Sequence, residues 1–449
     1  MRRIVSLAAS VFMMTGIVHA ADLSDNGWRL WLDPQASWKS DALYLPDEVD
    51  LAKLPVNPPT GGWDMLSGTN GIPVTLPSTV EEHYWSRNLS NDSNPLKTVE
   101  HNGSYTGVSW WYRTFNAPKL ASRQHCRLEI GGSRLRAEVY LNGKLVGYNI
   151  ISELPFTVDV TKAIKPGTEN LLAIRITNPG GQLAWDDTKT IEWGKYRLPM
   201  SHGFGGLDKG IRLLVRGENY VSDLAVLNTP ATRTIEVEAA ITATGKGYRG
   251  PVEIKLSRDG TIVTTTNVEA DVPAGSTGTV TKEISVPAAE LWDIEHPVLY
   301  RATARLPKIA NSDAQTSFGF RWFTAEGIGT NATLRLNGRR IVVRSSISWG
   351  FWASNGMFPD DAAVAREIAS VKALGLNSLQ NHRHMPNEHV LAGFDHAGLL
   401  RYCEAGSGLY SFTNRPWADD PKPQDKVDVS GDSGEPKSFT ARYAMFKIL

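Results

Sequence analysis

The sequence contains very few cysteines and no excess of charge of either sign. Cys126 and Cys403 are the two cysteines among 449 residues, and because we expect them in different domains, we expect no disulfide between them. A chain of this length can be held together without disulfides by two or more hydrophobic cores. Lysine plus arginine and aspartate plus glutamate both number 47, so the formal net charge is zero. Nucleic-acid binding proteins neutralise phosphates with a basic excess or patch, so the sequence predicts no nucleic-acid partner.

The sequence has a single long apolar run, and this run lies at the N-terminus. Met1, Arg2 and Arg3 form a short basic start, residues 4–18 are apolar, and Val18-His19-Ala20 places small residues where a signal peptidase reads them. This pattern is typical of a signal peptide over residues 1–20, cleaved after Ala20, and it predicts a secreted or periplasmic protein. A membrane anchor is the alternative, but it needs about 20 apolar residues. We therefore expect no membrane partner after cleavage.

Residues 21–217 predict an antiparallel β-sandwich. The first 80 or so of these residues are rich in Pro, Gly, Asn and Trp and show little periodicity, although Ile72–Pro77 is extended because residues before proline avoid the helical region. Asn142-Gly143 is a strong hairpin signal, since a type I′ turn needs positive φ at both central residues. No helical pattern interrupts the strands, which favours a sandwich. The expected strands are Ser109–Phe115, Arg136–Leu141, Phe156–Val160, Leu171–Thr177 and Ile211–Val215.

Residues 218–326 predict a second all-β unit with immunoglobulin-like architecture. Apolar and polar residues alternate over 235–241 and 252–256, and Asp259-Gly260 marks a turn. About 100 residues of short alternating strands are typical of such a sandwich. The cysteines and tryptophan of antibody domains are absent, so the prediction concerns the architecture alone. Further strands are expected at Tyr300–Leu306 and Ser317–Phe323.

The pattern changes after Gly327, where strands alternate with helices. Asp360 and Asp361 are helix-start residues, and Gly375 is suited to end that helix in a left-handed conformation. Strand–helix–strand at this spacing predicts parallel strands with crossover helices. Residues 327–449 are fewer than the roughly 250 of a complete barrel, so they predict the first part of a (β/α)8 TIM barrel with about three strands. The expected strands are Ile341–Arg344, Leu376–Gln380 and Leu399–Cys403, and the second helix is Glu388–His396.

Several motifs, in this order, resemble glycoside hydrolase family 2, which includes β-galactosidases, β-glucuronidases and β-mannosidases. The matching segments are VSWWYRTFNAP (108–118), AEVYLNGKLVG (137–147), FTVDVT (156–161), LW (291–292), HPVLY (296–300), FGFR (318–321) and LNG (336–338). The resemblance covers nearly the whole chain after residue 20. It implies a galactose-binding-like jelly-roll domain, an immunoglobulin-like domain and a TIM-barrel catalytic domain, with carbohydrate as the partner.

The resemblance also implies the chemistry. Family 2 enzymes are retaining glycosidases, which need two carboxyl groups about 5–5.5 Å apart. In the family these groups come from barrel strands four and seven, and the acid/base lies in an Asn-Glu pair. The chain ends after the third expected strand, so we assign no catalytic residue within it and expect no hydrolysis by this chain alone. Asn387-Glu388 follows Pro386 and precedes a helix, so we interpret Glu388 as a helix-start carboxylate.

The resemblance suggests six candidate residues for substrate binding. Residues 377–386 are similar to the family motif NAVR-x-SHYP, so Arg383 and His384 are expected to contact sugar hydroxyls, unless they form a network that stabilises the loop. Glu404 matches the Glu of the family motif DEA, with Cys403 in place of Asp, and a structural ion pair is its alternative role. Trp185 and Asp186 resemble a family loop that reaches toward the barrel mouth. Trp349, after the first expected barrel strand, is the sixth candidate, and core or domain-interface packing is the alternative for both tryptophans.

No metal or cofactor is expected. The family continuation NIETHG, which would supply a magnesium site, is replaced by Gly406-Ser407-Gly408. His382, His384, His389 and His396 fit no known ligand spacing. Two functions stay open: a glycosidase that hydrolyses terminal β-glycosidic bonds, and a non-catalytic secreted carbohydrate-binding or scaffold protein with a vestigial half barrel.

Overall fold

The computed structural model describes most of the chain from residue 20 to residue 403. The described residues are 20–44, 49–68, 70–84, 105–150, 155–180, 190–193, 196–199, 205–207, 209–327, 329–348, 359–381, 386 and 388–403. The expected signal peptide therefore lies almost wholly outside them. None of the described helices is long and apolar enough to cross a membrane.

The first unit is an antiparallel β-sandwich, as the sequence predicts. Asn142 and Gly143 both have positive φ and form the turn between β7 (Arg136–Leu141) and β8 (Lys144–Asn149). One sheet consists of β1 (Ala20–Asp22), β14 (Ile211–Arg216), β6 (His125–Ile130) and β9 (Phe156–Asp159). The other consists of β3 (Ile72–Val74), β2 (Trp28–Asp33), β5 (Gly107–Asn116), β10 (Glu169–Asn178), β7 (Arg136–Leu141) and β8 (Lys144–Asn149). Smaller pieces are η2 (Trp63–Leu66), β4 (Ser78–Thr79), α1 (Val80–Tyr84), β11 (Thr190–Trp193), β12 (Tyr196–Pro199) and β13 (Gly206–Leu207).

The six-stranded sheet is buried on both faces. Trp111, Val139 and their neighbours face the other sheet and form the sandwich core. Trp110 and Tyr140 point the opposite way, into a second apolar cluster with Trp38 and Trp193. Successive side chains of a strand point to opposite faces, so the burial of all six residues of β7 means that both faces are covered.

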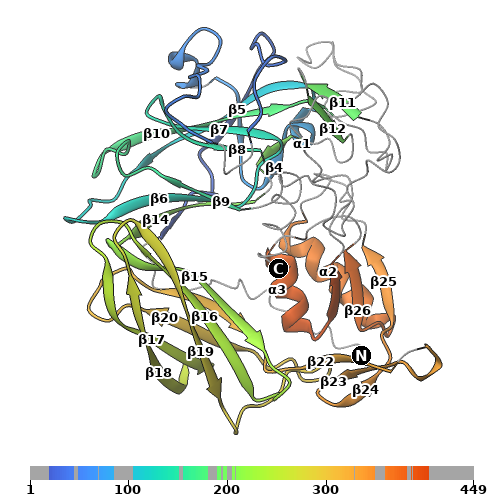
Figure 1. Cartoon of the computed structure of the whole chain (residues 1–449). Coiled ribbons are helices and arrows are strands. Elements are labelled where there is room, and N and C mark those ends of the chain that lie inside the picture. The colour runs from blue at the N-terminus through green and yellow to red at the C-terminus, as the bar shows by residue number, and fades with distance from the viewer. Residues whose placement is uncertain are drawn as a thin grey trace, which may run out of the picture.

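The second unit is also a two-sheet antiparallel structure, and it lies below the first sandwich in Figure 1. Its core contains the alternating residues of β16 (Thr234–Ala243) and β17 (Tyr248–Arg258), with Val237 and Ile254 fully buried. Asp259 and Gly260 form the expected turn. One sheet is β15 (Asn219–Asn228), β16 (Thr234–Ala243) and β19 (Ser276–Ser285), and the other is β18 (Thr261–Val272), β17 (Tyr248–Arg258), β20 (Tyr300–Arg305) and β21 (Ala314–Phe318).

The expected strand Ser317–Phe323 is divided in the structure. β21 ends at Phe318, and β22 begins at Phe323. Between them Phe320 is fully buried and its carbonyl oxygen accepts a hydrogen bond from the backbone N–H of Trp292 at 2.9 Å. The backbone of Phe320 is thus bonded to Trp292 in the interval between the two strands.

The expected strand Ile341–Arg344 is also corrected by the structure. Asn337 and Gly338 have positive φ values and form a turn, so β24 runs back antiparallel to β23. The first parallel strand therefore starts later, at Ser345. β22 (Phe323–Glu326), β23 (Thr333–Leu336) and β24 (Arg339–Ile341) form one small sheet, with η3 (Gly329–Asn331) before β23. β22 lies before and β23 after the expected domain boundary at residue 326, and that boundary stays a prediction.

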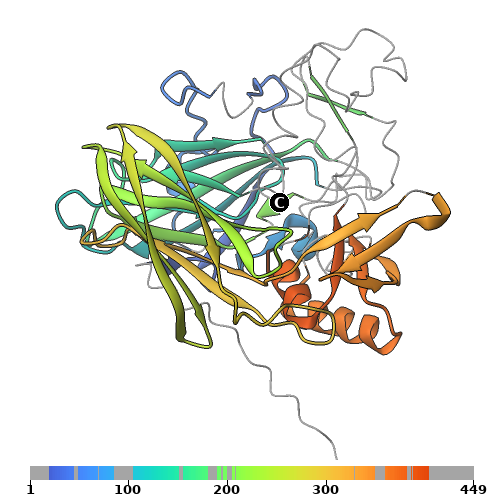
Figure 2. The ribbon, with the colours of Figure 1, turned by 60° about the horizontal axis from the view of Figure 1, so that its bottom comes forward.

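Three parallel strands and two helices follow, as expected for strand–helix alternation. Their sheet is β25 (Ser345–Ser348), β26 (Ser378–Asn381) and β27 (Leu400–Cys403). α2 (Asp361–Ala373) is capped by the Asp360 carboxylate, which accepts from the backbone N–H of Ala363 at 2.7 Å. α3 (Glu388–Ala397) packs with α2 and Leu379 in a small apolar core. Figure 2 shows this unit beside the second sandwich.

Trp292 connects the second sandwich to the parallel unit. Its side chain is fully buried, and its indole N–H donates to the carbonyl oxygen of Asp395 in α3 at 2.8 Å. Asn337 donates from its side chain to the carbonyl oxygen of Trp292 at 2.9 Å. A Cβ on Gly319 would lie 2.6 Å from the Cβ of Trp292. The LW, FGFR and LNG motifs therefore meet at one joint.

We predict that Gly398→Ala destabilises the protein more than Gly375→Ala. The two glycines follow α3 and α2 with φ values of +68° and +69°, so both substitutions cost about 1–2 kcal/mol of left-handed strain. A Cβ on Gly398 would also lie 2.3 Å from the carbonyl oxygen of Ile294 in the second sandwich, whereas a Cβ on Gly375 meets nothing within 4 Å. Urea unfolding of both variants measures the difference, and equal losses of stability would contradict the close approach at the joint.

Candidate functional site

The carboxyl ends of the three parallel strands meet at one edge of their sheet. Ser348, Asn381 and Cys403 are paired in register as the last residues of β25, β26 and β27. Ser348 and Asn381 are buried. The ends of these strands point toward the first sandwich in Figure 1. Because the loops that follow parallel strands converge at this edge, it is where α/β units bind ligands, and it is the candidate functional site.

Four of the six candidate residues follow this edge in the sequence. Trp349 comes directly after β25, Arg383 and His384 come shortly after β26, and Glu404 comes directly after β27. All six candidates, including Trp185 and Asp186, lie outside the described residues. The strand register brings together the ends of β25, β26 and β27, after which four of the candidates follow in the sequence. The roles of all six stay predictions.

The buried amide of Asn377 sets the start of the parallel sheet. Its side-chain oxygen accepts from the backbone N–H of Arg344 at 2.8 Å, and its side-chain nitrogen donates to the carbonyl oxygen of Val342 at 2.9 Å. These two bonds hold the segment before β25 against the start of β26. The amide therefore helps to fix the register that aligns the strand ends.

A carboxylate that the sequence did not single out lies next to the end of β25. Glu367 of α2 accepts a hydrogen bond from the Ser348 hydroxyl at 2.9 Å, while its other oxygen is buried without a partner. Burial raises the pKa of Glu367, and the bond from Ser348 offsets part of that rise. Glu367 sits between the apolar positions Val364 and Ile368 in the sequence, so the helical pattern alone suggests a solvent-facing residue.

Glu388 and the histidines have ordinary structural surroundings where the structure describes them. Glu388 is exposed and is the first residue of α3, where the helix dipole stabilises a carboxylate. The Nε2 atom of His389 lies 2.8 Å from the carbonyl oxygen of Pro359. His382 and His384 lie outside the described residues. Among the residues that are described, no three His, Cys, Asp or Glu side chains come together as metal ligands would.

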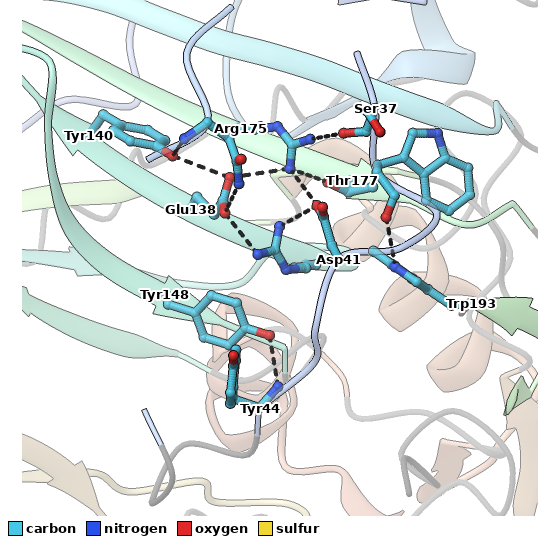
Figure 3. A network of polar contacts seen from close by, with 12 residues as sticks. Ser37, Asp41, Tyr44, Glu138, Tyr140, Tyr148, Arg175, Thr177 and Trp193 are labelled. Carbon is cyan, nitrogen blue, oxygen red and sulfur yellow. Dashed lines mark hydrogen bonds and ion pairs between the residues drawn. The ribbon is translucent and has the colours of Figure 1, made fainter. Parts of the chain in front are cut away.

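The first sandwich contains a buried network of charges on the outer face of its six-stranded sheet (Figure 3). Arg136 and Glu138 of β7 and Arg175 of β10 are at most 2% exposed. Glu138 Oε1 lies 2.8 Å from Arg136 Nη2, and its Oε2 lies 3.2 Å from Arg175 Nη1. Asp41 Oδ2 lies within 3.2 Å of both guanidinium groups. Each buried charge therefore has an opposite partner, which buried ions require.

This network attaches the segment around Trp38 to the sheet. Arg175 donates to the carbonyl oxygen of Ser37 at 3.0 Å, and the backbone N–H of Tyr44 donates to the Tyr148 hydroxyl at 3.1 Å. The carbonyl oxygen of Trp38 accepts from the Trp193 indole of β11 at 3.0 Å, and the two rings pack edge to face. The sequence signal for this network is the alternation of charged and apolar residues in β7. This alternation places Arg136 and Glu138 on the same face of the sheet.

Glu81 of the short helix α1 is a second buried carboxylate. Its oxygens accept from the backbone N–H of Tyr105 at 2.7 Å and of Gly205 at 3.2 Å, so it joins segments that are distant in the sequence. Burial raises the pKa of Glu81 to about 7, despite these hydrogen bonds and the nearby charge of Arg134. Beside it, Ser78 Oγ lies 2.6 Å from Nε2 of His83 and 3.0 Å from Oε2 of Glu82.

Two antiparallel sandwiches precede the parallel strands, and comparisons with known proteins match this part of the chain to one family. A model described as the glycosyl hydrolase 2 galactose-binding domain-like family matches residues 63–206, and the model of glycosyl hydrolases family 2 matches residues 219–321. The chain belongs to glycoside hydrolase family 2 and covers the N-terminal part of that family's proteins.

Relatives and solved structures of this family match most of the chain. A putative β-glucuronidase of Formosa agariphila is 25% identical over 355 residues, covering 76% of this chain and 39% of the relative. A β-galactosidase of Bacteroides ovatus is 24% identical, covering 67% and 34%. The crystal structure of a family 2 β-galacturonidase from Eisenbergiella tayi bound to galacturonate superimposes with a TM-score of 0.61 at 21% identity, over 86% of this chain and 58% of that one. The chain thus spans less than two fifths of the length of the Formosa agariphila and Bacteroides ovatus proteins.

We predict that Glu81 makes the stability of the protein depend on pH. Its pKa of about 7 in the folded state lies above its ordinary value of 4.5, so its contribution to stability is complete below pH 4.5 and is lost as the pH rises through 7. The loss amounts to about 3 kcal/mol, because one pKa unit is worth about 1.4 kcal/mol. Urea unfolding of the wild type and Glu81→Gln at several pH values measures it.

The Glu81→Gln variant separates this carboxyl from the other titrating groups. Its amide cannot ionise, so its stability relative to the wild type should rise by about 3 kcal/mol between pH 4.5 and pH 8. Any mismatch of the amide with the two N–H groups is the same at every pH. A constant difference between the two proteins across this range would show that Glu81 does not titrate as described.

Proposed function

We propose that this chain is part of an exported glycosidase that hydrolyses terminal β-glycosidic bonds with retention of configuration. The observation that carries the proposal is the alignment of Ser348, Asn381 and Cys403 at one strand edge, facing the first sandwich. Such an edge is where loops from successive strands can surround a sugar. On this proposal Trp349, Arg383, His384 and Glu404 contact the sugar from these loops, and Trp185 and Asp186 approach from the first sandwich.

The proposed barrel extends the three parallel strands. Ile347, Gln380 and Tyr402 lie side by side in register, and Leu379 packs on the opposite, helix-covered face. Ile347 and Tyr402 are 47% and 59% exposed, so the face without helices is uncovered among the described residues. In a (β/α)8 barrel this face becomes the interior. The uncovered apolar side chains therefore favour β25–β27 as the first strands of such a barrel.

The reacting carboxylates of the proposed enzyme lie outside the described residues. A retaining pair must stand about 5–5.5 Å apart. Of the described carboxylates near the strand edge, Glu367 accepts a hydrogen bond from Ser348 and Glu388 is an exposed residue in the first turn of α3, and we assign neither to the reacting pair. The similarity to a putative β-glucuronidase, a β-galacturonidase and a β-galactosidase favours hexuronic acids or galactose as the terminal sugar.

We predict that the 449-residue polypeptide binds a monosaccharide of this class without hydrolysing its nitrophenyl β-glycoside. Glu404→Gln should weaken binding about tenfold, since hydrogen bonds to a charged group contribute about 1.5–3 kcal/mol. Ligand-observed NMR with glucuronate, galacturonate and galactose measures binding, and nitrophenol release measures hydrolysis. Glu295→Gln, at an exposed position of the second sandwich, is the matched control and should leave binding unchanged.

Two outcomes would contradict these expectations. Hydrolysis that survives both Glu404→Gln and Glu388→Gln would mean that this polypeptide contains a reacting carboxylate pair that we have not assigned. Saturable binding by residues 21–216 alone, unaffected by Glu404→Gln in the longer polypeptide, would instead favour a non-catalytic carbohydrate-binding or scaffold protein.

We also propose export with cleavage after Ala20. The mature chain would then begin at Ala21, and both Ala21 and Asp22 would keep their pairing with β14. N-terminal sequencing of the protein recovered from periplasm or medium should read Ala-Asp-Leu-Ser. Recovery of a chain that still begins at Met1 in the membrane fraction would instead support the anchor.

A further inference from the structure

Asp395 lies between two arginines that belong to different parts of the protein. Its Oδ1 is 3.4 Å from Nη1 of Arg321, which follows β21 of the second sandwich, and its Oδ2 is 3.7 Å from Nη2 of Arg401 in β27. The side chains of all three residues are 25–29% exposed, so most of each side chain is removed from water. An ion pair in such surroundings is screened less than a surface pair.

The second sandwich also holds the backbone of Asp395. The Trp292 indole donates to its carbonyl oxygen at 2.8 Å, and the guanidinium of Arg321 lies 4.5 Å from the centre of the Trp292 ring. A cation over an indole face is an attractive arrangement. Burial lowers the pKa of Arg321, and Asp395 opposes that shift while Arg401 adds to it. One residue near the end of α3 is thus fixed through both its side chain and its main chain.

The opposite end of α3 lies near the first sandwich. The guanidinium of Arg212 in β14 pairs with Glu129 at 2.9 Å. Burial lowers the pKa of Arg212, but Glu129, with further contributions from Glu388 and Asp22, produces a net rise. Glu388 of α3 is therefore close enough to act electrostatically on the first sandwich. The second sandwich thus contacts this helix near its C-terminal end, and Glu388 at the opposite end acts electrostatically on Arg212 of the first sandwich.

Arg401 connects this joint to the candidate site. It is paired in register with Leu379 of β26, and β27 ends two residues later at Cys403, beside Asn381. One guanidinium nitrogen of Arg401, Nη1, is buried without a partner, so Asp395 is the charge that balances this group among the described residues. Moving Asp395 would move the partner that holds β27 in place.

We propose that Asp395 is a positioning residue of the glycosidase site, through which the second sandwich sets where the end of β27 stands at the strand edge. This inference rests on the proposed function, because it gives the end of β27 and Glu404 a place in the site. Asp395 touches no substrate in this scheme. It acts through Arg401, and Arg321 and Trp292 hold it in position.

The test compares Asp395→Asn, Arg321→Gln and the double variant of the 449-residue polypeptide. Amide hydrogen exchange of β27, followed by mass spectrometry, reports the strand directly and needs no ligand. We expect exchange in β27 to accelerate about tenfold in each single variant, because Asp395→Asn removes the partner of the partly buried Arg401 and Arg321→Gln removes a group that holds Asp395 in position. The double variant should exchange no faster than the singles, since both substitutions break one linked network. β16, in the second sandwich, should not change.

Sugar affinity is the second measurement. The conservative variant Asp395→Glu distinguishes an effect on the position of β27 from a general loss of protein stability. Asp395→Asn should weaken monosaccharide binding about tenfold at a temperature where the protein stays folded, and Asp395→Glu, which restores the charge, should recover most of it. Arg305→Gln is the matched control: it removes an arginine that pairs with Glu253 at 2.7 Å on the second sandwich, away from α3. It should alter neither β27 exchange nor affinity.

The outcomes distinguish this inference from the proposed function. Unchanged β27 exchange in Asp395→Asn, or exchange effects that simply add in the double variant, would overturn the positioning role. Faster exchange with unchanged sugar affinity would also overturn it, because Asp395 would then be structural only. If the wild type binds none of the sugars, the proposed function fails, and the exchange measurement still decides whether Asp395 holds β27.

Discussion

The buried indole of Trp292 is the contact on which the placement of the candidate site depends. It occupies the space between the second sandwich and α3, and its N–H must find an acceptor because an unpaired donor there would cost about 1–3 kcal/mol. The acceptor is the main chain of α3, at Asp395. One side chain thus removes a large apolar surface from water and orients the helix that precedes β27. Gly319 has no room for a Cβ beside Trp292, and Gly398 has none beside the carbonyl group of Ile294.

A different kind of constraint organises the first sandwich. Its six-stranded sheet is covered on the outer face by a segment with little regular structure, and such a segment cannot satisfy its polar groups through a strand ladder. Arg175 supplies one missing partner by donating to the carbonyl oxygen of Ser37, and its charge pairs with Asp41 of that segment and with Glu138 of the sheet. Removing one member would leave another charge buried and unpaired, which is strongly unfavourable. This paired array positions Trp38, and Trp38 in turn meets Trp193 of β11.

The regular part of the fold could be predicted from periodicity, and the exceptions have identifiable causes. β7 matches its expected bounds, and the hairpin at Asn142-Gly143 is confirmed, because alternation and turn chemistry are local properties. β2 was missed because its neighbours are rich in Pro, Gly and Trp, although Trp28, Leu30 and Leu32 alternate inward. The start of the parallel sheet was misplaced by a few residues because Asn337-Gly338 turns β24 back on β23.

The sequence by itself determined the order of two sandwiches and a strand–helix unit, together with the family to which the chain belongs. Those properties follow from periodicity, turn residues and ordered motifs, which are all local. Only the tertiary structure decided that Ser348, Asn381 and Cys403 share one edge, that Glu367 reaches Ser348, and that Asp395 joins Arg321 to Arg401. These contacts join residues far apart in the chain, and their formation depends on how whole elements pack. The spacing of residues in the sequence does not predict how these elements pack.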